Sequence, residues 1–246
     1  MKKIGVISDV HGNLQALQTA LDFLDKQQCT QIIHTGDVVD IGANSKECLQ
    51  LLLQNNVLCL LGNHDRDFVQ NHAYHGSLSH VSARHKRFVF DSLQGWRHVV
   101  EKFPTSHTAI LGGKKVLFQH YCFSKNPQSG YLFAPIENYP TAAKFDAMYG
   151  DDCPFDAVFF GHKHEPCDKI GKRLYVDVGS VGCHPEPLAT GVVITYDDVQ
   201  FRYDRFAIPY NQEETRKAIT ESDLPDGQYL FDFYFLHKPN MPDLVE

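Results

Sequence analysis

The sequence predicts an α/β fold that begins with a parallel sheet. Over residues 2–61, three short apolar runs alternate with two amphipathic helical patterns in the order β-α-β-α-β, and this order favours parallel strands joined by right-handed crossovers. The chain has 246 residues, of which 43% are hydrophobic and 22% charged, and this composition is typical of a globular protein. Its length corresponds to one or two domains at about 150 residues each. Because no linker interrupts the pattern, we expect one domain.

The first strands and helices follow from residue spacing. Apolar runs bounded by polar residues predict strands at residues 2–8, 31–34 and 57–61. Asn13 precedes leucines at positions 14, 17, 21 and 24, and this spacing predicts an N-capped helix with one apolar face. Asn44 and Glu47 have the spacing of a capping box in front of a second leucine-rich helix.

The remaining chain is predicted to mix helices and strands. Helices are expected at residues 81–93 and 211–220, and strands at residues 97–103, 108–119, 157–160, 173–178, 191–196 and 199–203. The first two of these strands are expected to be antiparallel, and a Gly112-Gly113 turn interrupts the second. Residues 124–140 lack periodicity and are predicted to form a long loop, which in compact domains is often functional. We expect a domain over residues 1–205, with residues 206–246 as a C-terminal appendage packed on it.

Charge and cysteine usage restrict the partners and the compartment. The chain carries 23 basic and 30 acidic residues, a net charge of −7, which argues against a stable nucleic acid partner because such partners reward a basic surface. No apolar stretch approaches the ~18 residues of a membrane span, and Asp9 and His11 interrupt the N-terminal run before the ~7–15 apolar residues of a signal peptide. The 7 cysteines form no CxxC pair and favour reduced thiols. We expect a cytoplasmic protein without a membrane partner, and leave its oligomeric state open.

Polar side chains follow the ends of five predicted strands. The five motifs are Asp9-Val10-His11, Gly36-Asp37 with Asp40, Gly62-Asn63-His64-Asp65, Gln119-His120 and Gly161-His162-Lys163-His164. In open α/β sheets ligands bind beyond the carboxyl ends of strands, so the motifs are expected to converge in space. Each motif alone is an ordinary turn sequence. If so many ionisable groups gathered without a cation, their repulsion and desolvation would cost several kcal/mol. The whole set therefore predicts a metal site.

The candidate ligands indicate two metal ions. Three side chains offer oxygen and four offer imidazole nitrogen: Asp9, Asp37, Asn63, His11, His120, His162 and His164. This set exceeds the needs of one tetrahedral ion and suits two ions ~3.5–4 Å apart that share a carboxylate. Mixed imidazole, carboxylate and amide ligands suit Mn, Fe or Zn better than Ca or Mg. Two such ions lower the pKa of a bridging water and clamp the oxygens of an in-line displacement at phosphorus.

The same motifs resemble those of a known family. SDVHGN, GDVVD, GNHD, the post-strand His120 and GHKH together look like the calcineurin-like metallophosphoesterase superfamily. SDVHGNLQAL, GDVVDIGANSKEC, LGNHDR and VDVGSVGCHPEP are similar to a bacterial and archaeal branch of predicted phosphodiesterases, and the match runs over residues 2–203. The resemblance implies a four-layer αββα sandwich with a dinuclear site at its upper edge. It also implies two divalent ions, with Mn favoured and Fe, Zn or Ni as alternatives.

Carried over by position, the resemblance implies roles for nine residues. The first metal would be held by Asp9, His11 and His164, the second by Asn63, His120 and His162, and Asp37 would bridge them. His64 would serve as the acid at the leaving oxygen. Asp40 would orient that histidine, because a histidine acid needs a hydrogen-bonded partner to fix its tautomer.

Three further positions bear on the substrate. Ile41 stands where protein-phosphatase members of the family carry Arg, so phosphoproteins rank last as substrates. Arg66 is a candidate phosphate contact or else a solvated surface residue. Tyr121 stands where the family has Gly, and is a candidate for stacking a nucleobase or for anchoring the loop.

We therefore expect a phosphoesterase that hydrolyses small phosphodiesters or nucleotides by attack of a metal-bridging hydroxide. The alternatives within the same chemistry are a dinucleoside polyphosphate hydrolase and a Ser/Thr protein phosphatase. The alternative of another class is a non-catalytic scaffold that keeps the fold without turnover.

Overall fold

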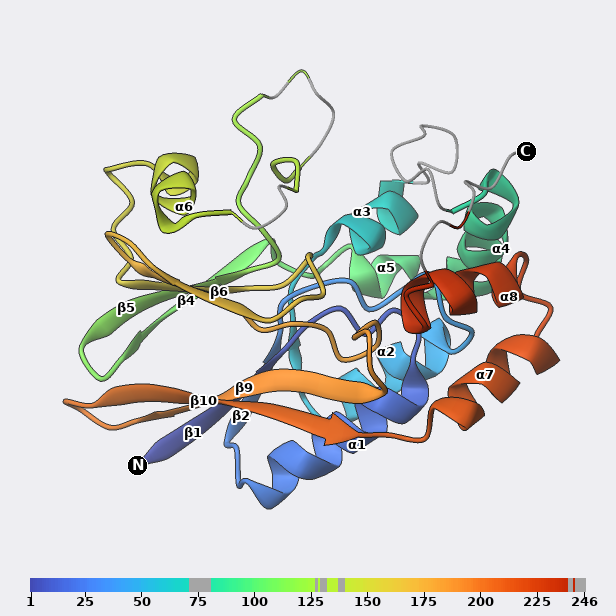
Figure 1. Cartoon of the computed structure of the whole chain (residues 1–246), viewed down its shortest axis with the longest axis horizontal. Coiled ribbons are helices and arrows are strands. Elements are labelled where there is room, and N and C mark those ends of the chain that lie inside the picture. The colour runs from blue at the N-terminus through green and yellow to red at the C-terminus, as the bar shows by residue number, and fades with distance from the viewer. Residues whose placement is uncertain (71–80, 127, 129–131, 137–139, 239–240, 242–246) are drawn as a thin grey trace.

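Two five-stranded sheets lie face to face, and helices cover their outer sides (Figure 1). The computed structural model describes residues 1–70, 81–126, 128, 132–136, 140–238 and 241. Between the sheets, Val6 and Ile194 of one pack with Phe118 and Phe159 of the other in a buried core. Two more apolar clusters lie on the outer sides, and each joins one sheet to the helices that cover it. This is the predicted four-layer αββα sandwich.

The first sheet has the strand order β10-β9-β1-β2-β3. Its strands are β1 (Lys2–Ile7), β2 (Gln31–His34), β3 (Leu58–Cys59), β9 (Leu188–Tyr196) and β10 (Phe201–Pro209). β2 is parallel to both β1 and β3, and the strands are connected by α1 (Leu14–Lys26) and α2 (Ser45–Gln54). The predicted β-α-β-α-β start is therefore confirmed. β9 is antiparallel to β1, and β10 to β9, so the complete sheet is mixed.

The second sheet has the strand order β4-β5-β6-β8-β7. Its strands are β4 (Ser106–Leu111), β5 (Lys114–Gln119), β6 (Ala157–Phe160), β7 (Cys167–Ile170) and β8 (Leu174–Asp177). β5, β6 and β8 are parallel, and the two edge strands are antiparallel to their neighbours. The predicted Gly112-Gly113 turn joins β4 to β5, with φ of 57° and 74° that only glycine adopts easily.

The two predicted helix caps have different outcomes. The Asn13 side chain accepts the N–H of Ala16 at 3.2 Å, so the first cap is confirmed. Asn44 makes no side-chain cap hydrogen bond, so the predicted capping box is wrong. Its backbone N–H instead donates to the carbonyl of Gly12 at 3.1 Å, which holds this loop against the loop after β1.

Residues 97–103, predicted as a strand, are largely helical. A 3₁₀ turn at Gln94–Trp96 continues α4 (Ala83–Leu93) and leads into the short helix α5 (Arg97–Val100). Trp96, Val100 and Phe103 pack against the core. Their spacing of four and three residues places them on one helical face, whereas a strand would alternate them.

Several elements lie where the sequence shows no clear periodicity. They are α3 (Asn63–Gln70), α6 (Ala142–Tyr149), β7 and α8 (Gly227–Leu230), which runs into a π-helical turn at Phe231–Phe235. Part of the predicted 124–140 loop lies outside the described residues. The part that is described includes Phe133, which forms an isolated antiparallel bridge with Phe123.

The C-terminal segment lies on the body of the protein. β10 runs through position 205, where the sequence suggested a boundary, and α7 (Gln212–Glu221) follows close to its predicted place. Beyond it, Phe231 and Phe235 pack with Ile41 and Cys183 in a separate buried cluster. Across the described ranges, none of the helices combines the length and apolar character needed to cross a membrane.

Candidate metal centre

The loops after β1, β2, β5 and β6 meet at one end of the two sheets. The N–H of Asp9 donates to the carbonyl of Gly36 at 3.0 Å, which joins the first two loops. Across the sheets, the N–H of His162 donates to Oδ2 of Asp9 at 3.0 Å. Within the second sheet, Gly161 N–H donates to the carbonyl of His120 at 3.0 Å. The motifs converge as predicted, but they come from two sheets.

The loop after β3 is tied to the loop after β2 by one buried carboxylate. Asp65 is fully buried, and its two oxygens accept four backbone N–H groups: those of Asp37 (2.8 Å), Val38 (3.0 Å), Val39 (3.2 Å) and Gly62 (3.1 Å). Because charge-assisted hydrogen bonds are the stronger kind, Asp65 fixes the backbone that carries Asp37 and Asn63. The last Asp of GNHD is therefore structural support for the site.

The backbone of these loops adopts a conformation that L-residues rarely take. Six of the candidate site residues have positive φ, between 47° and 78°: Asp9, His11, Asp37, Asp40, His162 and His164. Such left-handed conformations cost free energy and persist where the surrounding structure enforces them, commonly at functional sites. Here they turn each side chain off its strand toward a shared centre.

One cluster of ligand atoms comes from Asp9, His11 and His164. The Nε2 atoms of His11 and His164 are 3.1 Å apart. Oδ1 of Asp9 lies 3.4 Å from Nε2 of His164 and 3.7 Å from Nε2 of His11. This oxygen is buried and has no hydrogen-bond partner in the described part of the chain. A buried carboxylate oxygen facing two imidazole nitrogens at these distances fits a divalent cation.

The other cluster comes from Asn63, His120 and His162. Nε2 of His120 lies 2.9 Å from Oδ1 of Asn63 and 3.1 Å from Nδ1 of His162. His120 is fully buried. Its Nε2 therefore faces an amide oxygen and a second imidazole, which again is a donor set suited to a divalent metal.

Asp37 lies between the two clusters. Its Oδ2 is 3.1 Å from Nε2 of His120 and 3.9 Å from Nε2 of His11. Its Oδ1 accepts the backbone N–H of His64 at 2.8 Å, which fixes the rotation of the carboxylate. One oxygen of Asp37 is thus directed at both clusters, and this is the placement a bridging carboxylate requires.

The pKa values of these groups reflect burial and close opposite charge. Burial by itself raises the pKa of Asp9, but the close imidazoles of His11 and His164 hold it well below its ordinary value. Burial also opposes ionisation of Asp37, and the charges of neighbouring histidines lower its pKa. Burial and the nearby His120 lower the pKa of His162 to about 3, which favours the neutral, ligating imidazole.

His64 and Asp40 form a hydrogen-bonded pair beside the clusters. Nδ1 of His64 lies 2.7 Å from Oδ2 of Asp40, and the His64 and His11 rings pack edge to face with centroids 4.7 Å apart. Burial opposes a charged His64, but the charge of Asp37 and the hydrogen bond to Asp40 raise its pKa to about 9. The pairing leaves Nε2 of His64 as the ring atom that can donate a proton to a substrate.

The two candidate substrate contacts differ in exposure. Arg66 lies half-buried in the first turns of α3. Tyr121 is only 1% exposed, and its ring packs 5.7 Å from the Phe160 ring and 5.1 Å from the His162 ring. The ring therefore packs beside His162 from within the core, which favours the loop-anchoring interpretation over stacking on a nucleobase.

Two residues near the site are absent from the sequence prediction. His85 is fully buried, and its Nε2 lies 2.6 Å from Oδ1 of Asp40. The available signal was a histidine on the apolar stripe that it shares with Val89 and Leu93 of α4. Cys183 groups with His11 and His164 as potential ligands whose atoms lie within 4.8 Å of one another. Cys183 does not directly follow a strand, so the strand-end pattern did not mark it.

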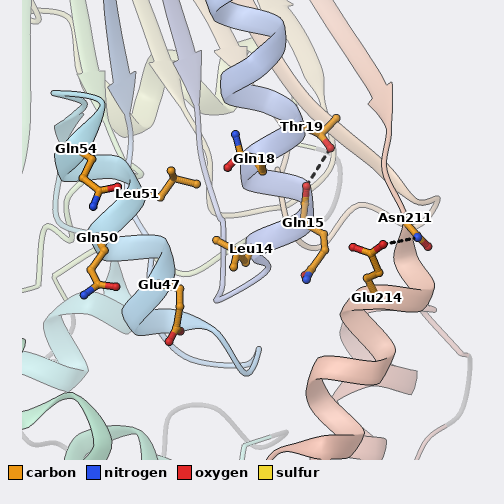
Figure 2. Close-up of a pocket in the computed structure, with 10 residues that line it drawn as sticks. All are labelled: Leu14, Gln15, Gln18, Thr19, Glu47, Gln50, Leu51, Gln54, Asn211 and Glu214. Carbon is orange, nitrogen blue, oxygen red and sulfur yellow. Dashed lines mark hydrogen bonds between the residues drawn. The ribbon is translucent and has the colours of Figure 1, made fainter.

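A separate pocket of about 470 Å³ lies between α1, α2 and the start of α7 (Figure 2). Its lining is mostly polar and includes Glu47 and Glu214, and Asn211 donates to Glu214 at 2.9 Å. None of the seven candidate ligands lines it. Two carboxylates without a cation repel a phosphoester anion, so this pocket does not suit phosphoester chemistry.

Facing sheets covered by helices, with His and Asp clusters at their strand ends, define the metallophosphoesterase class. The chain belongs to the calcineurin-like phosphoesterase superfamily, whose domain matches residues 1–198. This membership supports a hydrolase that acts on phosphoester bonds. The superfamily usually binds divalent metals, and the His and Asp clusters described above fit such ions.

Relatives extend over nearly the whole chain. The chain is 26% identical over 251 residues to the uncharacterized protein MJ0912 of Methanocaldococcus jannaschii, covering 93% of this chain and 97% of that protein. The hypothetical protein PH1004 from Pyrococcus horikoshii OT3 is similar in structure, with a TM-score of 0.78, 16% identity, and 96% and 99% of the two chains covered. A metallophosphoesterase from Sphaerobacter thermophilus has a TM-score of 0.65 and 22% identity, covering 93% and 98%. These two structures share the fold.

Proposed function

We propose that this protein is a dinuclear-metal-dependent phosphoesterase that hydrolyses small phosphodiesters or nucleotides. The observation that carries the proposal is the position of Asp37, with one oxygen directed at both ligand clusters and the other bound to the backbone of His64. Asp9, His11 and His164 would hold one ion, and Asn63, His120 and His162 the other. Mn is the favoured metal, with Fe, Zn or Ni as alternatives, because the donors mix nitrogen and oxygen.

The chemistry divides between the ions and the chain. When bound, the two cations supply an activated hydroxide and neutralise charge on the phosphoryl oxygens. His64 donates a proton from Nε2 to the leaving oxygen, and Asp40 holds the tautomer and orientation needed for that transfer. Arg66 is proposed as a contact to the substrate phosphate.

One observation favours small substrates over phosphoproteins. Ile41 occupies the position at which protein-phosphatase members carry Arg, and it is fully buried. Phe231 and Phe235 of the C-terminal segment pack in the same cluster. A buried apolar side chain cannot supply the positive charge that the Arg of protein-phosphatase members supplies. We therefore rank nucleotides and small diesters first as substrates, dinucleoside polyphosphates second and phosphoproteins last.

The same proposal includes compartment and partners. All seven cysteines are free thiols, which supports a reducing, cytoplasmic setting. The net charge of −7 supports small phosphoesters over a stable nucleic acid partner.

The test uses purified protein with Mn²⁺ and bis-p-nitrophenyl phosphate. Wild-type protein should hydrolyse the diester, and His64→Ala should lower kcat by about 100-fold or more while elemental analysis shows unchanged metal, because a general acid contributes about 10²–10⁴-fold. His98→Ala, at an exposed position, is the matched control. If the protein is a non-catalytic scaffold, it should bind metal without turnover. Absence of hydrolysis with Mn, Fe, Zn and Ni would therefore rule out the enzyme and favour the scaffold.

A further inference from the structure

His85 joins the proposed catalytic pair to the C-terminal segment. Its Nε2 lies 2.6 Å from Oδ1 of Asp40, whose other oxygen, Oδ2, is 2.7 Å from Nδ1 of His64. On the opposite side of the ring, Nδ1 of His85 lies 3.1 Å from the backbone carbonyl oxygen of Pro225. The His85 side chain is fully buried, so water does not compete for these contacts.

The partners of His85 determine its hydrogens. The carbonyl oxygen of Pro225 can only accept a hydrogen bond, so Nδ1 of His85 carries a hydrogen. Asp40 is buried, which disfavours its charge, but hydrogen bonds from His64 and His85 hold its pKa well below the ordinary value. An ionised Asp40 also only accepts, so Nε2 of His85 carries a hydrogen as well. Both ring nitrogens of His85 therefore donate, one to the Asp40 carboxylate and one to the Pro225 carbonyl.

The turn at Pro225 and Asp226 is hydrogen-bonded to the start of α4, the helix that carries His85. Asp226 accepts hydrogen bonds from the Ser82 hydroxyl and the Arg84 guanidinium. Ser82 also caps α4 by accepting the N–H of His85 at 3.1 Å. The charged groups around the His85 ring are therefore Asp40 on one side and Asp226, paired with Arg84, on the other.

We propose that His85 is a positioning residue for phosphoester hydrolysis, which sets the rotation of Asp40 and thereby the orientation of His64. This proposal rests on the proposed function. His85 binds Oδ1, so the Asp40 carboxylate presents Oδ2 to His64 in one orientation. Oδ1 of Asp40 also accepts the backbone N–H of Ile41 at 2.8 Å. Without His85, Oδ1 keeps that bond but loses the imidazole donor, so the carboxylate is held less firmly in the orientation that presents Oδ2 to His64. The C-terminal segment contributes to the site by holding the far side of the His85 ring.

Kinetics on two substitutions at position 85 test the role. His85→Leu removes both donors and should lower kcat for bis-p-nitrophenyl phosphate by about 10–100-fold, as expected for loss of a residue behind the reacting groups. KM and bound Mn should stay close to their wild-type values, because the contacts of His85 are to Asp40 and Pro225 and not to a proposed metal ligand. His85→Gln keeps a donor able to reach Asp40 and should recover part of kcat. His98→Leu, at an exposed position, should change nothing.

A spectroscopic measurement is independent of turnover. In protein labelled with ¹⁵N-histidine, Nδ1 and Nε2 of His85 should each give the signal of a hydrogen-bonded N–H, and His85→Gln should remove those signals. This readout decides the contacts of His85 even if the wild-type protein hydrolyses no diester, so failure of the proposed function and failure of this inference are distinguishable. It also decides the matter if His85→Leu does not fold. A wild-type kcat in folded His85→Leu, or a ring nitrogen of His85 without hydrogen, would overturn the proposal.

Discussion

Oδ1 of Asp37 accepts the backbone N–H of His64 at 2.8 Å. The proposed bridging carboxylate and the proposed acid are therefore held in one fixed relation before any substrate binds. Because Oδ2 of Asp37 is directed at the ligand clusters, the charge of Asp37 and its hydrogen bond serve different purposes. Substitutions can separate them.

Asp37→Asn should lose metal while it keeps the fold. An Asn side chain still offers an oxygen to the N–H of His64, but it removes the negative charge shared by the two clusters. We expect at least one of two Mn ions per chain to be lost in elemental analysis. Asp91→Asn, at an exposed position of α4, is the matched control. Equal metal content in the two variants would mean that Asp37 does not bridge.

Gly62→Ala should displace the same carboxylate by volume alone. A Cβ at position 62 would lie 2.1 Å from Oδ1 and 2.4 Å from the backbone nitrogen of Asp37, closer than atoms can approach. We expect lower metal content and a loss of several kcal/mol in unfolding free energy, as for other overpacked sites. Gly95→Ala adds the same methyl group with nothing within 4 Å and should change neither. A Gly62→Ala protein with full metal content would contradict the geometry of this loop.

Asp65→Asn should destabilise the protein. The amide offers one oxygen where the carboxylate serves four backbone N–H groups, and its NH₂ faces donors. Losing two charge-assisted hydrogen bonds predicts a decrease of about 3–6 kcal/mol in the free energy of unfolding. Urea unfolding monitored by circular dichroism measures it, with Asp91→Asn expected to lie within about 0.5 kcal/mol of wild type. If Asp65→Asn also changed the free energy of unfolding by no more than about 0.5 kcal/mol, these hydrogen bonds would be dispensable.

Asp177→Asn should alter the pH dependence of stability. Burial of Asp177 raises its pKa well above the ordinary value, and its Oδ2 makes no hydrogen bond within the described ranges. The folded chain thus binds this proton more tightly than the unfolded chain, so stability falls as pH rises from about 4 through the raised pKa.

The amide cannot ionise and removes that loss. Between about pH 5 and about pH 8, the unfolding free energy of Asp177→Asn should therefore improve relative to wild type by at least about 1 kcal/mol, since one pKa unit corresponds to about 1.4 kcal/mol. Parallel curves for the two proteins across this range would show that Asp177 is ionised in the folded state.

Local spacing is enough to predict much of this fold. The alternation of apolar runs and helical stripes over the first 60 residues is confirmed by β1, α1, β2, α2 and β3. Prediction from local spacing fails at residues 97–103. Val99 and Val100 are β-branched and favour a strand when they are considered alone. The helix forms because Trp96, Val100 and Phe103 all pack on the core. α8 and the turn after it have no strong pattern of their own and are held by the cluster around Ile41.

The sequence by itself determines which polar groups stand at the strand ends, because each motif directly follows its own apolar strand. It also determines the superfamily, through those motifs together. Only the tertiary structure decides that strands from two sheets bring the motifs together, and that Asp40 is shared by His64 and by His85, a residue 45 positions further along the chain. The physical reason is that local periodicity reports which face of an element is buried, whereas the partner of a buried polar group depends on how distant elements pack.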